Sequence, residues 1–236
     1  ACGVAEATIF RFCRSLGFQG YNEMKIALAK ATATASPVAL KLEPGIDTQT
    51  LCNHAYTMAV EALNATRNVL DPEAVDHAAT LLQRARQVYC LGQGGSQVLA
   101  GDIWARFSML STKFRTAGDS HMQAITASLM GPEHVVLFIS YSGCTRDMMD
   151  TLHLAKDNGA KVILITHYDD APGAALADVV LLCGATESPL DSGSIPAKLA
   201  MLFVANVLVL RYTLDNQELA NLSLSRTSQA LGGKLL

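Results

Sequence analysis

VVLFISYSGCTRDMMDTLHLAK, residues 135–156, combines a strand pattern, a tight turn and a helix pattern in one stretch of sequence. Residues 135–139 form an unbroken apolar run rich in β-branched side chains, which is typical of a strand buried on both faces. Met148, Leu152 and Ala155 then recur at helix spacing. A strand, a turn containing a glycine and a helix start together direct backbone N–H groups and the positive end of the helix dipole toward an anion.

The turn in this stretch is rich in hydroxyl groups. Ser140, Ser142 and Thr145 all fall within six residues. A helix cap would explain one hydroxyl but not three, so the pattern favours a phosphate-binding turn. The turn has no lysine of the kind that a nucleoside triphosphate site uses and no obvious magnesium ligand.

A second glycine-rich turn, Gly92–Gln97, follows the apolar run at 88–91. It matches the dinucleotide pattern G-x-G-x-x-G only in part, because Gln97 replaces the third glycine. Asp119 could act as the acidic ribose ligand, so a nicotinamide site stays open as an alternative, although it leaves residues 140–145 without a role. A Walker site is excluded for want of Gly-Lys-Ser/Thr. Both turns follow parallel strands, whose carboxyl ends border the ligand crevice in such sheets.

Apolar periodicity along the rest of the chain predicts an α/β fold. Strands that alternate with helices indicate βαβ units, and therefore a five-stranded parallel sheet of the doubly wound, flavodoxin-like kind. Asp71 and Pro72 are expected to start one helix as its N-cap and first residue. The predicted strands cover 88–91, 112–116, 135–139, 162–165 and 178–183, and the predicted helices cover 21–35, 47–70, 71–82, 96–110, 119–130, 146–158, 193–215 and 217–231.

Composition is that of a compact protein with a large core: half of the 236 residues are hydrophobic and 17% are charged. The net charge of −3 argues against a chain devoted throughout to nucleic acid. The longest apolar run, Ala200–Leu210, is too short for a membrane span. The six cysteines are scattered without a C-x-x-C pair, and the histidines show no metal spacing, so we expect no disulfide, metal or cofactor, and a reducing cytoplasm.

Residues 7–16 form an amphipathic helix pattern that Gly17 would end. Its apolar face carries Ile9, Phe12, Cys13 and Leu16. Such a helix is often just a solvated surface helix, but outward arginines also suit the second helix of a helix-turn-helix. The residues expected to face DNA are Ala7, Thr8, Arg11 and Arg14.

These motifs carry a family resemblance. ISYSGCT (139–145) resembles the S-x-S-G-x-T phosphate turn of SIS (sugar isomerase) domains, and Gly92–Ser96 resembles the G-x-G-x-S turn that precedes it in those domains. GVAEATIFRFCRSLGFQGYNEMK (3–25) resembles the recognition helix and the following helix of RpiR-type bacterial regulators. The resemblance implies a partial helix-turn-helix at 1–35, a linker at 36–46 and a SIS domain at 47–236 with its α/β core at about 87–215. It also implies a sugar-phosphate site formed by Gly94, Gly95, Ser96, His121, Ser140, Tyr141, Ser142, Thr145 and Glu187.

The function that the resemblance implies is a DNA-binding regulator whose SIS domain binds a phosphorylated sugar as effector. The alternative is a sugar-phosphate isomerase with Glu187 as its base, and a third class is a dimerisation module that binds no ligand. We expect a homo-oligomer, because operators usually have two half-sites. Since the helices that precede the recognition helix in the family are absent here, we also expect residues 1–236 alone not to bind DNA.

Overall fold

The computed structural model describes residues 5–33, 45–185 and 193–233. The chain divides into two units. One holds α1 (Glu6–Ser15), α2 (Tyr21–Ala33) and the start of α3 (Thr48–Val69), up to Met58. The other runs from Ala59 and holds the sheet and its helices. The expected linker at 36–46 falls mostly outside the described residues, so the predicted domain boundaries stay predictions.

The sheet confirms the predicted fold class. Its five strands are all parallel and lie in the order β2-β1-β3-β4-β5, which is the flavodoxin-like order. The strands are β1 (Gln87–Gly92), β2 (Phe114–Thr116), β3 (His134–Ile139), β4 (Lys161–Thr166) and β5 (Val179–Leu182). Each predicted strand is present, with ends that differ by one or two residues.

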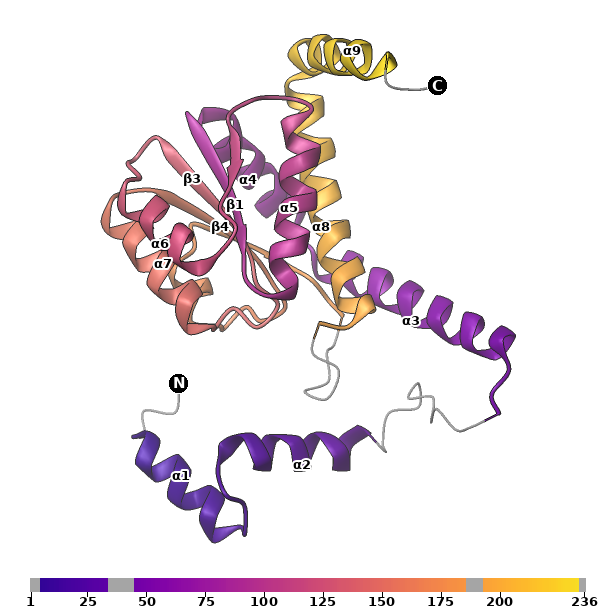
Figure 1. Cartoon of the computed structure of the whole chain (residues 1–236), viewed down its shortest axis with the longest axis vertical. Helices are drawn as coiled ribbons and strands as arrows, with labels where there is room; N and C mark the ends of the chain where they lie inside the picture. Colours follow the sequence, from indigo (N-terminus) through magenta and orange to yellow (C-terminus); the bar gives the residue numbers. More distant parts are fainter. Residues whose placement is uncertain (1–4, 34–44, 186–192, 234–236) are drawn as a thin grey trace. The chain divides into compact units, whose positions relative to one another are not determined.

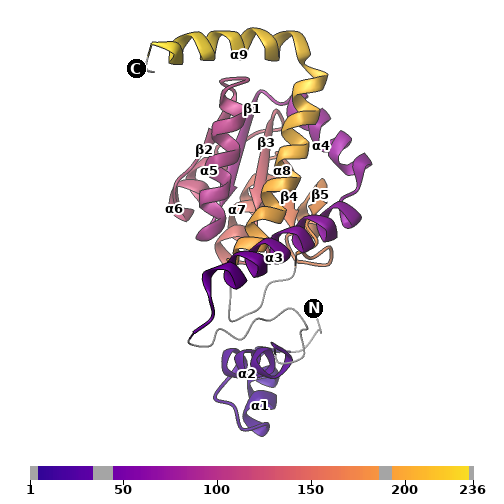
Figure 2. The ribbon, with the colours of Figure 1, turned by 90° about the vertical axis from the view of Figure 1, so that its right-hand side faces the viewer.

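Helices cover both faces of the sheet (Figures 1 and 2). Asp71 caps α4 by accepting from the Glu73 N–H at 2.9 Å, with Pro72 in the first turn, as predicted. The helices of this unit are α4 (Pro72–Arg84), α5 (Gly95–Ser108), α6 (Ser120–Ser128), α7 (Arg146–Asp157), α8 (Ile195–Asp215) and α9 (Gln217–Gly232), with a short 3-10 turn at Ala174–Leu176.

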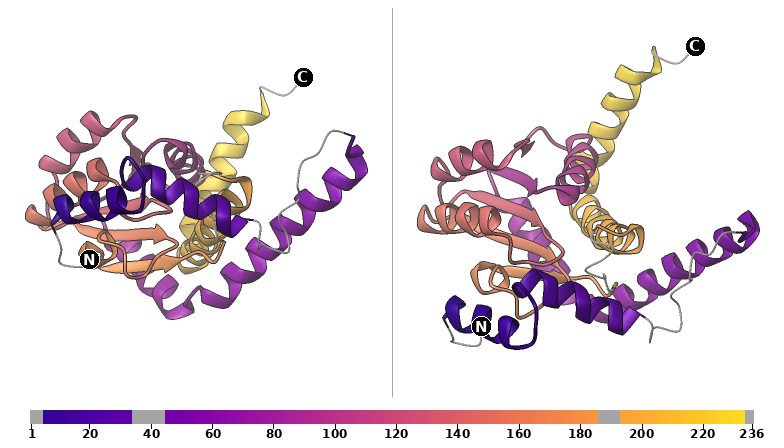
Figure 3. Two further views of the ribbon diagram at one scale, coloured as in Figure 1. Left: turned by 90° about the horizontal axis from the view of Figure 1, so that it is seen from below. Right: turned by 60° about the horizontal axis from the view of Figure 1, so that its bottom comes forward.

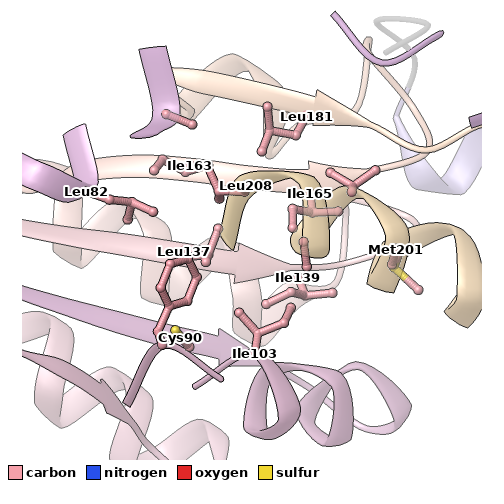
Figure 4. Packing of buried hydrophobic residues seen from close by; sticks show 14 of the residues in the cluster. Leu82, Cys90, Ile103, Leu137, Ile139, Ile163, Ile165, Leu181, Met201 and Leu208 are labelled. Atoms are coloured by element: carbon pink, nitrogen blue, oxygen red, sulfur yellow. The ribbon is translucent and has the colours of Figure 1, made fainter. Parts of the chain in front are cut away.

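One face of the sheet packs against α4, α5 and α8 and forms the larger core cluster. Figure 4 shows strand residues such as Cys90, Leu137 and Ile163 pointing toward Ile103 of α5 and Leu208 of α8. All five side chains are fully buried. Burial raises the pKa of the Cys90 thiol to about 12, so this cysteine is a core side chain and not a nucleophile.

The opposite face packs against α6 and α7, which lie on the far side of the sheet from α8 in Figure 3. Val136 and Phe138 of β3 meet Met148, Leu152 and Ala155 of α7 there. These are the apolar positions that the helix pattern of residues 146–158 places on one side, so the predicted face is confirmed. Because β3 is buried on both sides, its run of apolar residues has no polar alternation.

α8 corrects one expectation from the sequence. The helix has 21 residues, and by length and composition it could cross a membrane, whereas we expected no apolar segment long enough to do so. Its position explains the apolar sequence: Ala200, Val204 and Leu208 are buried against the sheet. The helix therefore needs apolar residues on a wide face for packing in the core.

The N-terminal unit contains the predicted helix pair. α1 ends before Gly17, whose positive φ of 89° and N–H bond to Arg14 O close the helix as expected. Cys13 is buried and lies 3.8 Å from the Met24 sulfur of α2. Phe12 and Leu16, which we expected on the same apolar face, are exposed in this structure.

Candidate functional site

The two glycine-containing turns lie side by side at the carboxyl edge of the sheet. β1 and β3 are neighbours, and their last residues, Gly92 and Ile139, are paired in register. The turn after β1 leads into α5, and the turn after β3 leads into α7. The predicted phosphate residues of both turns are therefore brought to one edge, as the topology of the fold requires.

A hydrogen bond joins the two turns directly. The Thr145 hydroxyl donates to Gln93 Oε1 at 3.1 Å. Thr145 occupies the N-cap position of α7, but its side chain does not cap that helix, and Gly94 at the N-cap of α5 has no side chain to do so. Both helices therefore begin at this edge without a side-chain cap. In α5 the Ser96 and Gln97 N–H groups donate to Gln93 O and Gly94 O, so the N–H groups that remain for an anion are that of Gly95 and those in the first turn of α7.

Ser140 shapes the second turn from within. It is only 6% exposed, and its oxygen accepts from the Gly143 N–H at 3.2 Å. Gly143 has a φ of 59°, and a Cβ there would lie 2.6 Å from the Ala171 Cβ, so no other residue fits without strain. Ser142 is half-buried and Thr145 is exposed. Of the three predicted hydroxyls, Ser142 and Thr145 are thus the more exposed, whereas Ser140 is buried and its oxygen shapes the turn.

Tyr141 lies in an aromatic cluster at the ends of β3 and β4. Its ring stacks on the His167 ring with centroids 5.0 Å apart, and Tyr168 packs edge-on against both rings. The Tyr141 hydroxyl donates to Ala185 O at 2.8 Å. Because that proton is taken by the backbone, Tyr141 holds the turn in place and does not donate it to a ligand in this conformation.

The other five predicted ligand residues lie in the first turn, at the start of α6 and outside the described residues. Gly94 and Gly95 are exposed at the tip of the first turn, and Ser96 is half-buried behind them. His121 is exposed near the start of α6. Glu187 lies outside the described residues. Asp119, considered above as a ribose ligand, caps α6 by accepting from the Met122 N–H at 2.8 Å. That bond gives Asp119 a structural role.

The structure also shows residues that the sequence analysis missed. Lys198, in the first turn of α8, has its Cε 3.8 Å from the position that a Cβ on Gly95 would take. The sequence does carry a signal for Lys198. A cation in the first turn of a helix is unfavourable next to the positive end of the helix dipole, so its presence there suggests a functional role. Two glutamines support the first turn, and neither stands out in the sequence.

Gln123, which is fully buried on α6, donates from Nε2 to Gly92 O at 2.7 Å and so fixes the end of β1. Gln93 bonds Thr145 through Oε1, while its Nε2 is buried without a partner among the described residues. The first turn is therefore supported by two glutamine side chains, Gln93 and Gln123, that bond specific atoms of the two turns. Among the described residues no group of histidine, cysteine or acidic side chains could hold a metal ion.

The chain matches two family models. Residues 81–211 match the SIS domain, and residues 1–35 match the helix-turn-helix domain of the rpiR family. These ranges agree with the positions of the sheet and of the N-terminal helix pair.

Curated relatives carry the same combination. The chain is 30% identical over 210 residues to a helix-turn-helix-type transcriptional regulator of Haemophilus influenzae, covering 87% of this chain and 73% of that protein. It is 32% identical over 220 residues to the regulator HexR of Pseudomonas aeruginosa, covering 91% and 75%. It is 29% identical over 229 residues to the regulator RpiR of Escherichia coli K12, covering 96% and 77%.

Solved structures share the fold. The Vibrio vulnificus NanR protein, complexed with ManNAc-6P, superposes with a TM-score of 0.83 at 23% identity, covering 98% of this chain and 83% of that one. A putative sugar-phosphate isomerase from Listeria monocytogenes gives a TM-score of 0.65 at 16% identity over 73% and 94%. At these identities the likeness shows the fold and not the activity. On the family models and the curated relatives, the chain belongs to the rpiR family of helix-turn-helix transcriptional regulators that carry a SIS domain.

Proposed function

We propose that this regulator responds to a phosphorylated sugar whose phosphate binds between the turns at Gly92–Ser96 and Ser140–Thr145. The observation that carries the proposal is the Thr145–Gln93 hydrogen bond of 3.1 Å, which brings two uncapped helix starts together. A phosphate held there would receive backbone N–H groups from both helices. NanR, which shares the fold, is known in complex with ManNAc-6P, and this supports a ligand of the same chemical class.

Side chains around the two turns complete the phosphate site. The Ser142 and Thr145 hydroxyls can donate, and Lys198 near Gly95 supplies a positive charge. Hydrogen bonds from these groups to an ionised phosphate are charge-assisted and therefore stronger than neutral ones. A hydroxyl can bond either to Gln93 or to the ligand, so phosphate binding would compete for the Thr145 proton. The sugar end of the ligand is left for His121 and Glu187, as the family resemblance implies.

The proposal is tested by calorimetry of the protein against aldose, ketose and amino-sugar phosphates, with the matching sugars lacking phosphate as controls. We expect binding that requires the phosphate group. Inorganic phosphate should compete with the sugar phosphate, because it fits the same donors. Binding of the unphosphorylated sugars with equal affinity would contradict the proposal.

The regulator acts, on this proposal, by coupling between the sugar-phosphate site and DNA. By linkage, the effector must bind the DNA-competent and DNA-incompetent states with different affinities, and DNA must change effector affinity by the same factor. We place the protein in the cytoplasm, where bacterial operators are accessible. Whether the effector raises or lowers operator affinity depends on which state it prefers.

We predict that the ligand is bound but not converted. Isomerisation needs a positioned base with room to move a proton between adjacent carbons. The described side chains of the two turns are hydroxyls, a thiol and amides, with no carboxylate or imidazole among them. Incubation with aldose and ketose phosphates, followed by NMR, should show no interconversion. Turnover at enzyme level that Glu187→Gln abolishes would make the chain an isomerase.

We also propose that the protein is a homo-oligomer. α8 and α9 expose a series of large apolar side chains that the described core does not use, including Leu210, Leu214, Leu219 and Leu222. Exposed apolar surface of this kind marks an interface more often than a solvated face, and two-fold symmetry would match two operator half-sites. Light scattering at micromolar concentration should give at least the dimer mass. The mass of one chain would contradict the proposal.

A further inference from the structure

Residues 183–185, which follow β5 directly, are bonded to the second turn of the proposed phosphate site. The Tyr141 hydroxyl donates to Ala185 O at 2.8 Å. The His167 ring donates from Nδ1 to Cys183 O at 2.8 Å, since a carbonyl can only accept. His167 is in turn held by its own N–H bond to Tyr141 O at 3.0 Å. The turn that would bind phosphate thus contacts this segment directly at Ala185 and, through His167 at the end of β4, also at Cys183.

The middle residue of the same segment contacts α3. The Gly184 N–H donates to the Thr66 hydroxyl oxygen at 3.1 Å. Thr66 is fully buried, and its hydroxyl donates to Ala62 O at 2.7 Å. The hydroxyl therefore both donates and accepts a hydrogen bond. A Cβ on Gly184 would lie 2.4 Å from the carbonyl carbon and oxygen of Ala65. The strand extension therefore touches the helix backbone itself, with no side chain between them to absorb a shift.

α3 is also the helix that leads to the N-terminal unit. It runs without a break from Thr48 to Val69, and its first part, up to Met58, belongs to the same unit as α1 and α2. A displacement of the helix at Thr66 is consequently applied to an element that is continuous with the DNA-binding part of the chain. Close contacts between two backbones transmit small displacements from one element to the other, because a close-packed interior has low compressibility.

We infer that Thr66 and Gly184 are positioning residues that pass the binding of phosphate in the two-turn site to α3. The route runs from Tyr141 in the turn, through the backbone of residues 184–185, to the buried hydroxyl of Thr66. This inference rests on the proposed function, because it needs a ligand whose binding alters the turn. It assigns a role in regulation to a threonine and a glycine that contact neither ligand nor DNA.

The test is hydrogen–deuterium exchange of α3 amides, measured with and without saturating inorganic phosphate. Inorganic phosphate is the probe because the proposed site binds its ligand through hydrogen bonds from the turn hydroxyls to the phosphate group. In the wild-type protein, phosphate should slow or speed exchange at residues 59–69 several-fold. Thr66→Val keeps the shape of the side chain but removes the acceptor for Gly184. We expect this variant to bind phosphate within about twofold of wild type, as no contact to the ligand is lost, while α3 exchange no longer responds.

Two matched variants separate this role from helix stability. Thr66→Ser restores the hydroxyl and should restore the response. Thr80 of α4 makes the same kind of hydroxyl bond to the helix backbone, at 2.9 Å to Asp76 O, but it accepts no N–H from a strand among the described residues. Thr80→Val should therefore leave the response intact. A full α3 response in Thr66→Val would overturn the inference. Unchanged α3 exchange in the wild-type protein while phosphate is bound would also overturn it. This second outcome can be observed even if the Thr66→Val variant does not fold.

Failure of the inference can be told from failure of the proposed site. If phosphate binds equally well to the wild-type protein and to Ser142→Ala, the site itself is wrongly placed. If Ser142→Ala loses phosphate but Thr66→Val keeps the α3 response, the site stands and only the route through Thr66 is wrong.

Discussion

Ser142→Ala is expected to weaken binding of a phosphorylated sugar about 10- to 100-fold, because a charge-assisted hydrogen bond contributes roughly 1.5–3 kcal/mol. Ser142 is half-buried in the turn between β3 and α7, where water competes less with the ligand than at an open surface. Its hydroxyl is not needed to shape the turn, since Ser140 accepts the Gly143 N–H. The loss should therefore appear in affinity and not in thermal stability.

The measurement is calorimetric titration with the sugar phosphate that binds the wild-type protein best. Ser128→Ala is the matched control, because Ser128 lies on α6 and its hydroxyl only bonds Ile125 O. In the same titrations Lys198→Met should weaken binding less, and the weakening should shrink at high salt as charge is screened. Equal affinity of the wild-type and Ser142→Ala proteins would show that the phosphate binds elsewhere.

The sequence was sufficient for the parts of the site that are local. A strand, a turn and a helix that follow one another, as in residues 135–156, are specified by apolar runs, glycine and helix spacing within a few residues. The parallel sheet then places both turns at one edge, so the meeting of Thr145 with the first turn could be expected from topology alone.

Contacts between distant segments could not be predicted in this way. Lys198 reaches Gly95 only because α8 packs beside α5 at a particular angle. Gly184 meets Thr66, 118 positions away in sequence, only because α3 crosses the end of β5. The apolar periodicity of each segment predicts a helix or a strand, but it does not predict which distant residue that segment will contact. A glycine that looks like a loop residue in the sequence is thus a contact point between a strand and a helix backbone in the fold.

The chemistry of single residues was also altered by their neighbours. Tyr141 and Ser140 were both expected to contact the ligand, and each also has a partner within the protein. The Tyr141 hydroxyl donates to Ala185 O, and the Ser140 oxygen accepts the Gly143 N–H. A motif read from sequence lists the groups that are near a ligand, but it does not tell which of them are already bonded. The binding experiments therefore begin with Ser142 and Lys198, since the Thr145 hydroxyl already donates to Gln93 Oε1.

Arg11→Ala should weaken operator binding by this regulator about 5- to 100-fold, the effect of losing roughly 1–3 kcal/mol when an arginine contact to DNA is removed. The four residues predicted to face DNA are all exposed on α1, as this role requires: Ala7, Thr8, Arg11 and Arg14. The guanidinium of Arg14 lies 5.3 Å from the centre of the Phe10 ring on the same helix, which restrains it. Arg11 makes no such ring contact in the described structure, so we choose it as the residue to change.

Fluorescence anisotropy with DNA from the protein's own promoter region, at two salt concentrations, distinguishes how Arg11 acts. If Arg11 reads a base, the variant should lose preference for the operator over unrelated DNA. If it contacts a phosphate, affinity should fall for all sequences, and the salt dependence should weaken by about one released counterion. Arg84→Ala is the control, because it removes the same charge from the exposed surface of α4, far along the chain from the helix pair. Equal losses in both variants would mean that net charge, and not the outward face of α1, governs binding to DNA.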